Sequence, residues 1–179
     1  MIDSAWKDWY RAKHNQECDS HGEAFEYYVT KVLTRFHDDY INPEAMGSQG
    51  DGGCDGLADK GAVLYACYGQ RATTGIDQKT KQKLESDFAR ALNNWPKFTE
   101  WRFVTNAPFG PTPTKCLETL RNQHGPNSQR PLTLTRWTAP EDLWWKVVNK
   151  LSFSQLDEVM PGVPHAQNVE LRDLVDLIE

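Results

Sequence analysis

Short apolar segments alternate with amphipathic ones along this chain, and the alternation limits the fold more than any other feature. Three segments have the length and composition of buried strands: residues 62–68, 100–106 and 132–137. Apolar residues at helical spacing surround and separate them, over residues 22–36, 73–93, 114–123 and 140–151. Strands that are joined through helices lie parallel, so the order predicts an α/β layer structure with at least part of its sheet parallel. We expect an earlier short helix near the N-terminus, packed through Trp6, Trp9 and Tyr10.

The length of 179 residues suits one domain with a sizeable core, which we place at residues 1–156. Residues 157–179 combine a linker containing proline and glycine with the start of an amphipathic helix, which indicates a longer protein. No apolar run approaches the ~20 residues of a membrane span, and the N-terminus has no apolar signal core. We therefore expect a cytoplasmic protein that does not enter the membrane. The cysteines form no CxxC pair and the histidines are dispersed, which predicts free thiols and no zinc site.

The net charge of −5 argues against unspecific nucleic-acid binding by the whole surface. The charge is uneven, because acidic residues dominate the first part of the chain whereas residues 71–102 are rich in lysine and arginine. Lys79, Lys81 and Lys83 fall in the helix expected there. Two interpretations stay open: a solvated helix face, or a local patch that faces the phosphates of a nucleic acid.

An acidic, glycine-rich loop precedes the first expected strand. It reads GSQGDGGCDG over residues 47–56, so its backbone must take conformations that side chains disfavour. Asp51 and Asp55 lie in this loop, and Glu26 lies in the first turns of the helix over 22–36. Each acid has a purely structural explanation, because aspartate satisfies backbone amides in tight loops and glutamate suits a helix N-terminus. Five tryptophans are expected in the core rather than as base-stacking surfaces: Trp95, Trp101, Trp137, Trp144 and Trp145.

The helix, loop and strand together resemble the restriction-endonuclease-like, or PD-(D/E)XK, superfamily, and within it the Mrr-like branch. The resemblance is carried by Gly22-Glu23-Ala24-Phe25-Glu26 and by the loop from Gly47 to Gly56, and it covers roughly residues 20–106. It implies a central mixed sheet flanked by helices and a Mg²⁺-dependent endonuclease that acts on DNA. It also implies that Asp55 is the principal metal ligand, that Glu26 is an auxiliary catalytic carboxylate, and that Asp51 is a second ligand or shapes the loop. Such an ion polarises the phosphate and acidifies a water, and magnesium prefers carboxylate oxygens.

The strand that follows departs from the Glu/Gln-x-Lys pattern of the family. Alignment places Ala66 at the ligand position and Tyr68 at the lysine. Alanine cannot bind a metal, and tyrosine, with a pKa near 10, replaces a cation poorly. Gln70 shares the face of Ala66 and Tyr68 by strand parity and is a candidate catalytic residue. The missing cation could come from the next helix, through Lys79, Lys81 or Lys83.

A closer likeness links the chain to the nuclease-like N-terminal domains of bacterial anti-phage defence proteins, with the ABC-three-component systems as the best match. It is carried by KLESDFARA from Lys83 to Ala91 and by Trp101, Phe103, Val104, Thr105 and Asn106. It implies partners among the other subunits or domains of a defence complex. The sequence leaves three functions open: a metal-dependent DNA endonuclease, a degenerate nuclease fold that recognises nucleic acid or protein, or a homo-oligomerisation domain.

Overall fold

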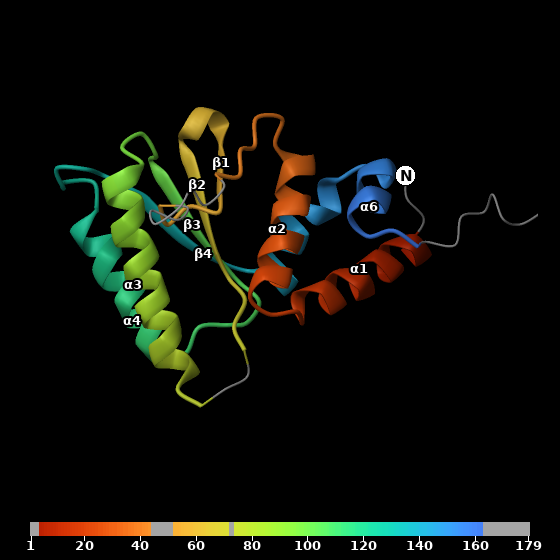
Figure 1. The fold of residues 1–179 in the computed structure, drawn as a ribbon, viewed down its shortest axis with the longest axis horizontal. Coiled ribbons are helices and arrows are strands. Elements are labelled where there is room, and N and C mark those ends of the chain that lie inside the picture. Colours follow the sequence, from red (N-terminus) through yellow and green to blue (C-terminus); the bar gives the residue numbers. More distant parts are fainter. Residues whose placement is uncertain (1–3, 44–51, 72–73, 163–179) are drawn as a thin grey trace, which may run out of the picture.

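The computed structural model describes residues 4–43, 52–71 and 74–162, and Figure 1 shows a central sheet with helices on both faces. Its helices are α1 (Ser4–Cys18), α2 (Glu23–Phe36), α3 (Ile76–Asn94), α4 (Pro111–Gln123), α5 (Trp144–Lys146) and α6 (Phe153–Val159). Its strands are β1 (Gly56–Ala58), β2 (Val63–Tyr68), β3 (Glu100–Thr105) and β4 (Thr133–Thr138). The described residues also form three short helical turns: η2 (Asp59–Gly61), η3 (Ala139–Leu143) and η4 (Val148–Lys150). The predicted α/β fold with a mixed sheet flanked by helices is confirmed.

The strands lie in the order β1-β2-β3-β4, with β1 antiparallel to β2 and the remaining neighbours parallel. The helices α3 and α4 make the two crossovers between parallel strands, as their place in the sequence requires. β1 was not expected, because three residues inside a glycine-rich segment carry no periodic signal. It forms by folding back on β2, and Ile41 extends this side of the sheet with a single antiparallel bridge to Leu57.

Side chains of β2 alternate between two covered faces. Leu64 and Ala66 pack with residues of α3 and α4 in one buried cluster, whereas Tyr65 and Cys67 pack with α2 in the other. Because both faces are buried, the strand reads as the near-continuous apolar run VLYACY. Figure 1 shows the same two layers, with α3 and α4 on one side of the sheet and α2 on the other.

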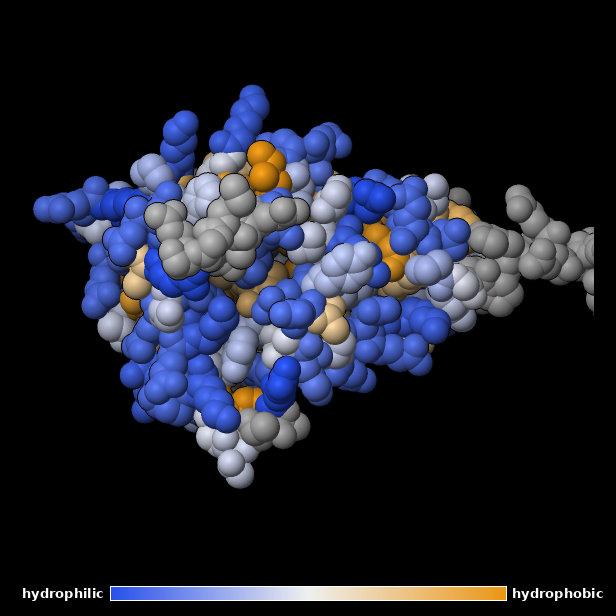
Figure 2. All heavy atoms as spheres, viewed as in Figure 1, coloured by the Kyte–Doolittle hydropathy of each residue, from blue (hydrophilic) through white to orange (hydrophobic). Residues whose placement is uncertain are grey.

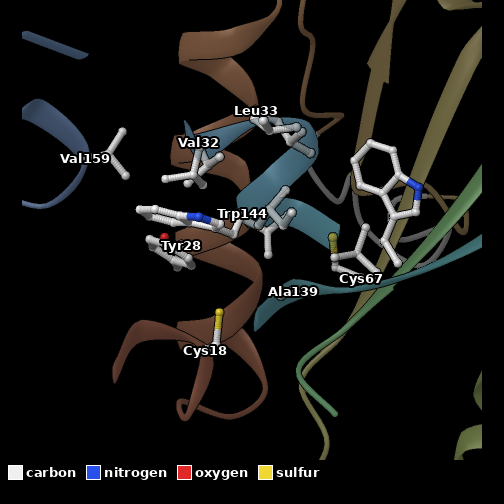
Figure 3. Packing of buried hydrophobic residues seen from close by; sticks show 14 of the residues in the cluster. Cys18, Tyr28, Val32, Leu33, Cys67, Ala139, Trp144 and Val159 are labelled. Atoms are coloured by element: carbon white, nitrogen blue, oxygen red, sulfur yellow. The ribbon is translucent and has the colours of Figure 1, made fainter. Parts of the chain in front are cut away.

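The segment after β4 is not the single helix that was expected over residues 140–151. It forms η3, α5 and η4 in succession, and the backbone leaves helical geometry at Val147 (φ −130°, ψ −70°). Two β-branched residues, Val147 and Val148, meet at this break, both are fully buried, and such residues favour a helix less than unbranched ones. Figure 3 shows Trp144 pointing toward Tyr28 and Val32 of α2, in the buried cluster to which all three belong.

The expectation that all five tryptophans lie in the core was partly wrong. Trp101, Trp137 and Trp144 are buried, but Trp145 is 60% exposed. Adjacent residues on a helix do not face the same side, so Trp145 points away from the core that Trp144 enters. Trp95 is half-buried.

The packed structure continues past residue 156. Ser152 and Gln155 form a capping box that begins α6, a local signal that the sequence already contains. Leu156, Val159 and Met160 are buried in the same cluster as the inner face of α2. The folded region therefore extends at least to Met160, and residues 163–179 lie outside the described part of the chain.

Figure 2 shows mainly hydrophilic residues on the face that it presents, with apolar residues in small separate groups. Among residues 4–43, 52–71 and 74–162, no helix combines the length and the apolar composition that crossing a membrane requires.

Candidate active site at the edge of the sheet

Asp55 lies at the edge of β2, at the point where pairing with β1 ends. Its backbone N–H donates to the carbonyl of Tyr65 (2.9 Å), and its Oδ2 accepts the backbone N–H of Cys67 (2.6 Å). The hydroxyl of Tyr40 donates to the Asp55 carbonyl (3.1 Å). These three hydrogen bonds hold the Asp55 carboxylate beside the C-terminal half of β2.

Glycine is required in the turn that delivers Asp55. Gly53 has a positive φ of 77°, and a Cβ at this position would lie 2.5 Å from the carbonyl oxygen of Asp87 in α3. A side chain would therefore force the turn away from α3. The glycine-rich sequence places the acidic turn directly against this helix.

The first turn of α2, which carries Glu26, packs against the same end of β2. Gly69, just after β2, is so close to the start of α2 that a Cβ on it would lie 2.5 Å from the nitrogen of Gly22. The N–H of Gly22 donates to the carbonyl of Gly69 (3.2 Å), and Glu26 follows one turn later in α2. This close packing brings the first turn of α2 to the end of the strand that Asp55 borders.

Lys83 of α3 is a cation whose electrostatic environment includes both of these carboxylates. Its Nζ lies 2.9 Å from Oδ2 of Asp87, and Asp87 is buried. Burial is the largest single effect and lowers the pKa of Lys83, but the charge and hydrogen bond of Asp87, together with the charges of Asp55 and Glu26, raise the pKa above its ordinary value overall. The ammonium group therefore stays charged at neutral pH.

The pKa of the buried Cys67 thiol responds to the same three charged groups. Burial raises the pKa of Cys67, Asp55 and Glu26 raise it further, and Lys83 lowers it. The same two carboxylates thus act on both Lys83 and Cys67, although they come from different elements. Asp55, Glu26 and Lys83 form one charged group, which we call the edge site.

Ala66 and Tyr68 contribute no metal ligand or cation to the edge site. These are the two residues that align with the metal ligand and the lysine of the PD-(D/E)XK pattern. Ala66 is fully buried in the apolar cluster between the sheet and α3. Tyr68 packs against the same cluster. Lys83 comes from the helix that covers this face, so the cation lies on the side of the sheet where the strand lacks one.

The remaining predicted site residues are Asp51, Gln70, Lys79 and Lys81. Asp51 lies outside the described residues. Gln70 is buried after β2, where its backbone is held by Asn106: the N–H of Gln70 donates to Asn106 Oδ1 (2.8 Å), and Asn106 Nδ2 donates to the Gln70 carbonyl (3.0 Å). Lys81 lines a hollow between α3 and α4 and pairs with Glu85, and Lys79 is exposed one turn before Lys83.

Sequence reasoning missed two residues that shape this region. Asp87 pairs with Lys83, and Asn106 ties the end of β2 to the loop before α2, because its Nδ2 also donates to the Ser20 carbonyl (3.1 Å). Both lie in motifs that the sequence had singled out, KLESDFARA and the end of the strand over 100–106. Their roles needed the packing of α3 and the end of β3 to become visible.

Comparison with protein-family models, with curated proteins and with solved structures found no match to this chain.

Proposed function

We propose that this chain is a metal-dependent phosphodiester hydrolase that cuts DNA in the cytoplasm, with the edge site as its active site. The observation that carries the proposal is the approach of two carboxylates, Asp55 and Glu26, and one charged lysine, Lys83, to the same end of β2. These groups come from a loop, from α2 and from α3. The sheet edge is the place where all three elements meet.

The donor set fits Mg²⁺. Asp55 and Glu26 offer carboxylate oxygens, the hard ligands that this ion prefers, and the half-buried Asp55 is positioned by backbone hydrogen bonds. When bound, the ion would polarise the scissile phosphate and lower the pKa of a water.

Lys83 acts as a positive charge and hydrogen-bond donor. Its raised pKa keeps it protonated at neutral pH, so it cannot accept a proton from water. A protonated lysine beside the phosphate stabilises the negative charge that develops on the phosphoryl oxygens. The proton of the attacking water therefore goes to a carboxylate, for which we assign Glu26.

A plasmid-cleavage assay tests the proposal. Wild-type protein with Mg²⁺ or Mn²⁺ should nick supercoiled DNA, and Asp55→Asn should reduce the rate at least ~100-fold, as expected when a metal ligand or charge-stabilising group is lost. Lys83→Met should also reduce the rate. Lys81→Met is the matched control, because Lys81 lies on the same helix but faces α4, and it should retain wild-type activity. Circular dichroism of each variant excludes unfolding. Intact DNA with the wild type, or equal cutting by Asp55→Asn, refutes the assignment.

A second function is favoured by the apolar environment of Ala66. A nuclease fold that has lost its strand ligand can serve as a recognition or interaction module, within the defence assembly that the sequence motifs suggest or as a homo-oligomer. Fluorescence anisotropy with labelled DNA separates the two functions. Binding that is equal in Mg²⁺ and in EDTA, without cleavage, supports the module and contradicts the hydrolase.

A further inference from the structure

Three side chains of types that bind metals come together beside the hairpin between β1 and β2, and none of them belongs to the edge site. His37 follows α2 directly, Asp39 lies in the turn after it, and Asp59 begins η2. One donor atom from each residue lies within 4.8 Å of the other two. Nδ1 of His37 lies 3.6 Å from Oδ1 of Asp59.

The His37 ring is held so that Nδ1 faces the two carboxylates. Its side chain is only 9% exposed, and its Nε2 lies 2.9 Å from the hydroxyl of Tyr65. The Tyr65 hydroxyl accepts a hydrogen bond from Arg102 (2.5 Å). Nδ1 is within ion-pair distance of Asp59, at 3.6 Å. One imidazole nitrogen and two carboxylate oxygens that all lie within 4.8 Å of one another are a donor set that suits a metal ion.

The outer contacts match those that support a metal-bound histidine. Such a histidine uses its second ring nitrogen in a hydrogen bond that fixes ring orientation, and Tyr65 provides that bond here. Arg102 is fixed in turn by two hydrogen bonds to Glu100, of 2.6 and 2.9 Å. This series of hydrogen bonds, from Glu100 through Arg102 and Tyr65 to His37, would orient the His37 ring before an ion binds.

The carboxylates are also placed by the fold. Oδ1 of Asp39 accepts the backbone N–H of Asp59 (3.0 Å), which holds the hairpin against the end of α2. Asp59 has a positive φ of 52°, a conformation that is uncommon outside glycine, asparagine and aspartate. Its side chain is 58% exposed and lines the open hollow beside His37, so water can complete a coordination shell there.

We propose that His37, Asp39 and Asp59 bind a divalent transition-metal ion of the Zn²⁺, Co²⁺ or Mn²⁺ class. One imidazole nitrogen with two carboxylate oxygens suits such borderline ions, whereas Mg²⁺ prefers oxygen ligands alone. The three protein ligands leave coordination positions for water. Because the ligands come from the end of α2 and from the β1–β2 hairpin, the ion would fasten these two segments together.

Isothermal titration calorimetry with Zn²⁺ on the metal-free protein tests the site, with Co²⁺ absorption as a second readout. Asp59→Asn is the decisive variant, because Asp59 is exposed and asparagine tolerates its positive φ. Binding should weaken at least ten-fold in Asp59→Asn. Asp38→Asn is the matched control: it removes a neighbouring exposed charge outside the group and should bind as the wild type does.

A third variant separates this site from the edge site. Asp55→Asn should leave Zn²⁺ binding at the hairpin unchanged, whatever it does to DNA cleavage. Zn²⁺ should also raise the melting temperature of the wild type and of Asp38→Asn, but not of Asp59→Asn. The proposal is overturned if the wild type binds no Zn²⁺, if Asp59→Asn binds it with unchanged affinity, or if Asp38→Asn and Asp55→Asn weaken binding as much as Asp59→Asn does.

Discussion

His14 should make this protein sensitive to mild acid. It lies in α1, is fully buried, and bridges two elements: one ring nitrogen, Nδ1, lies 2.6 Å from the hydroxyl of Tyr28, and Nε2 lies 2.7 Å from the carbonyl of Ala139. A carbonyl only accepts, so Nε2 carries the proton and Nδ1 accepts from Tyr28. Burial lowers the pKa of His14 from 6.5 to about 4; the Ala139 carbonyl opposes the shift and Arg11 adds to it.

The sign and size of the effect follow from this shift. Between about pH 6.5 and pH 4 the unfolded chain binds a proton at His14 that the folded protein does not bind, so acid favours unfolding. The free energy of unfolding falls by about 1.4 kcal/mol for each pH unit in this window, or by about 3 kcal/mol in all. Below about pH 4 both states bind the proton, and this contribution stops changing.

Urea unfolding between pH 7 and pH 4 measures the effect. His14→Gln cannot be protonated there, so its stability should fall less steeply than that of the wild type, even though it starts lower through loss of the Tyr28 hydrogen bond. His21→Gln, at an exposed position before α2, controls for the replacement of a histidine by glutamine. Acidic groups are common to all three proteins and cancel in the comparison. If the wild type and His14→Gln lose stability in parallel between pH 6.5 and pH 4, the argument from burial is wrong.

Two further substitutions test the packing of α3, each by urea unfolding with an internal control. Asp87→Asn should lower the free energy of unfolding by about 2 kcal/mol, which is less than for a fully buried pair because its partner Lys83 is 36% exposed. Glu85→Gln, in the more exposed pair on the same helix, should lower it by less than about 0.5 kcal/mol. Equal losses in the two variants would contradict a role for burial. Gly53→Ala should lower the free energy of unfolding by about 3 kcal/mol, because it combines a positive φ with a Cβ placed 2.5 Å from a backbone oxygen. Gly61→Ala, with a positive φ in open space, should lower it by about 1 kcal/mol. A similar loss of stability at both glycines would show that contact with α3 does not matter.

The local elements were largely readable from the sequence. β2 is an apolar run because both of its faces are covered, and the apolar spacing of α2 follows from packing one side of the helix on the sheet. These patterns lie in neighbouring residues, so composition and period reveal them. β1 escaped notice because its three residues are stabilised by β2 and not by their own propensity. The break at Val147 escaped because the apolar spacing on both sides of it remains helical.

The sequence by itself determined the α/β order and the acidic, glycine-supported turn that presents Asp55. Only the tertiary structure decided which lysine accompanies that turn: α3 packs so that Lys83 lies beside Asp55 and Glu26, while Lys81 faces α4. It also decided that His37 meets Asp39 and Asp59, because the β1–β2 hairpin folds back onto the end of α2. The physical reason is the same in both cases. The spacing of apolar residues along the sequence indicates which side chains are buried. Whether charged residues from distant segments approach one another depends on which surfaces of the elements pack together.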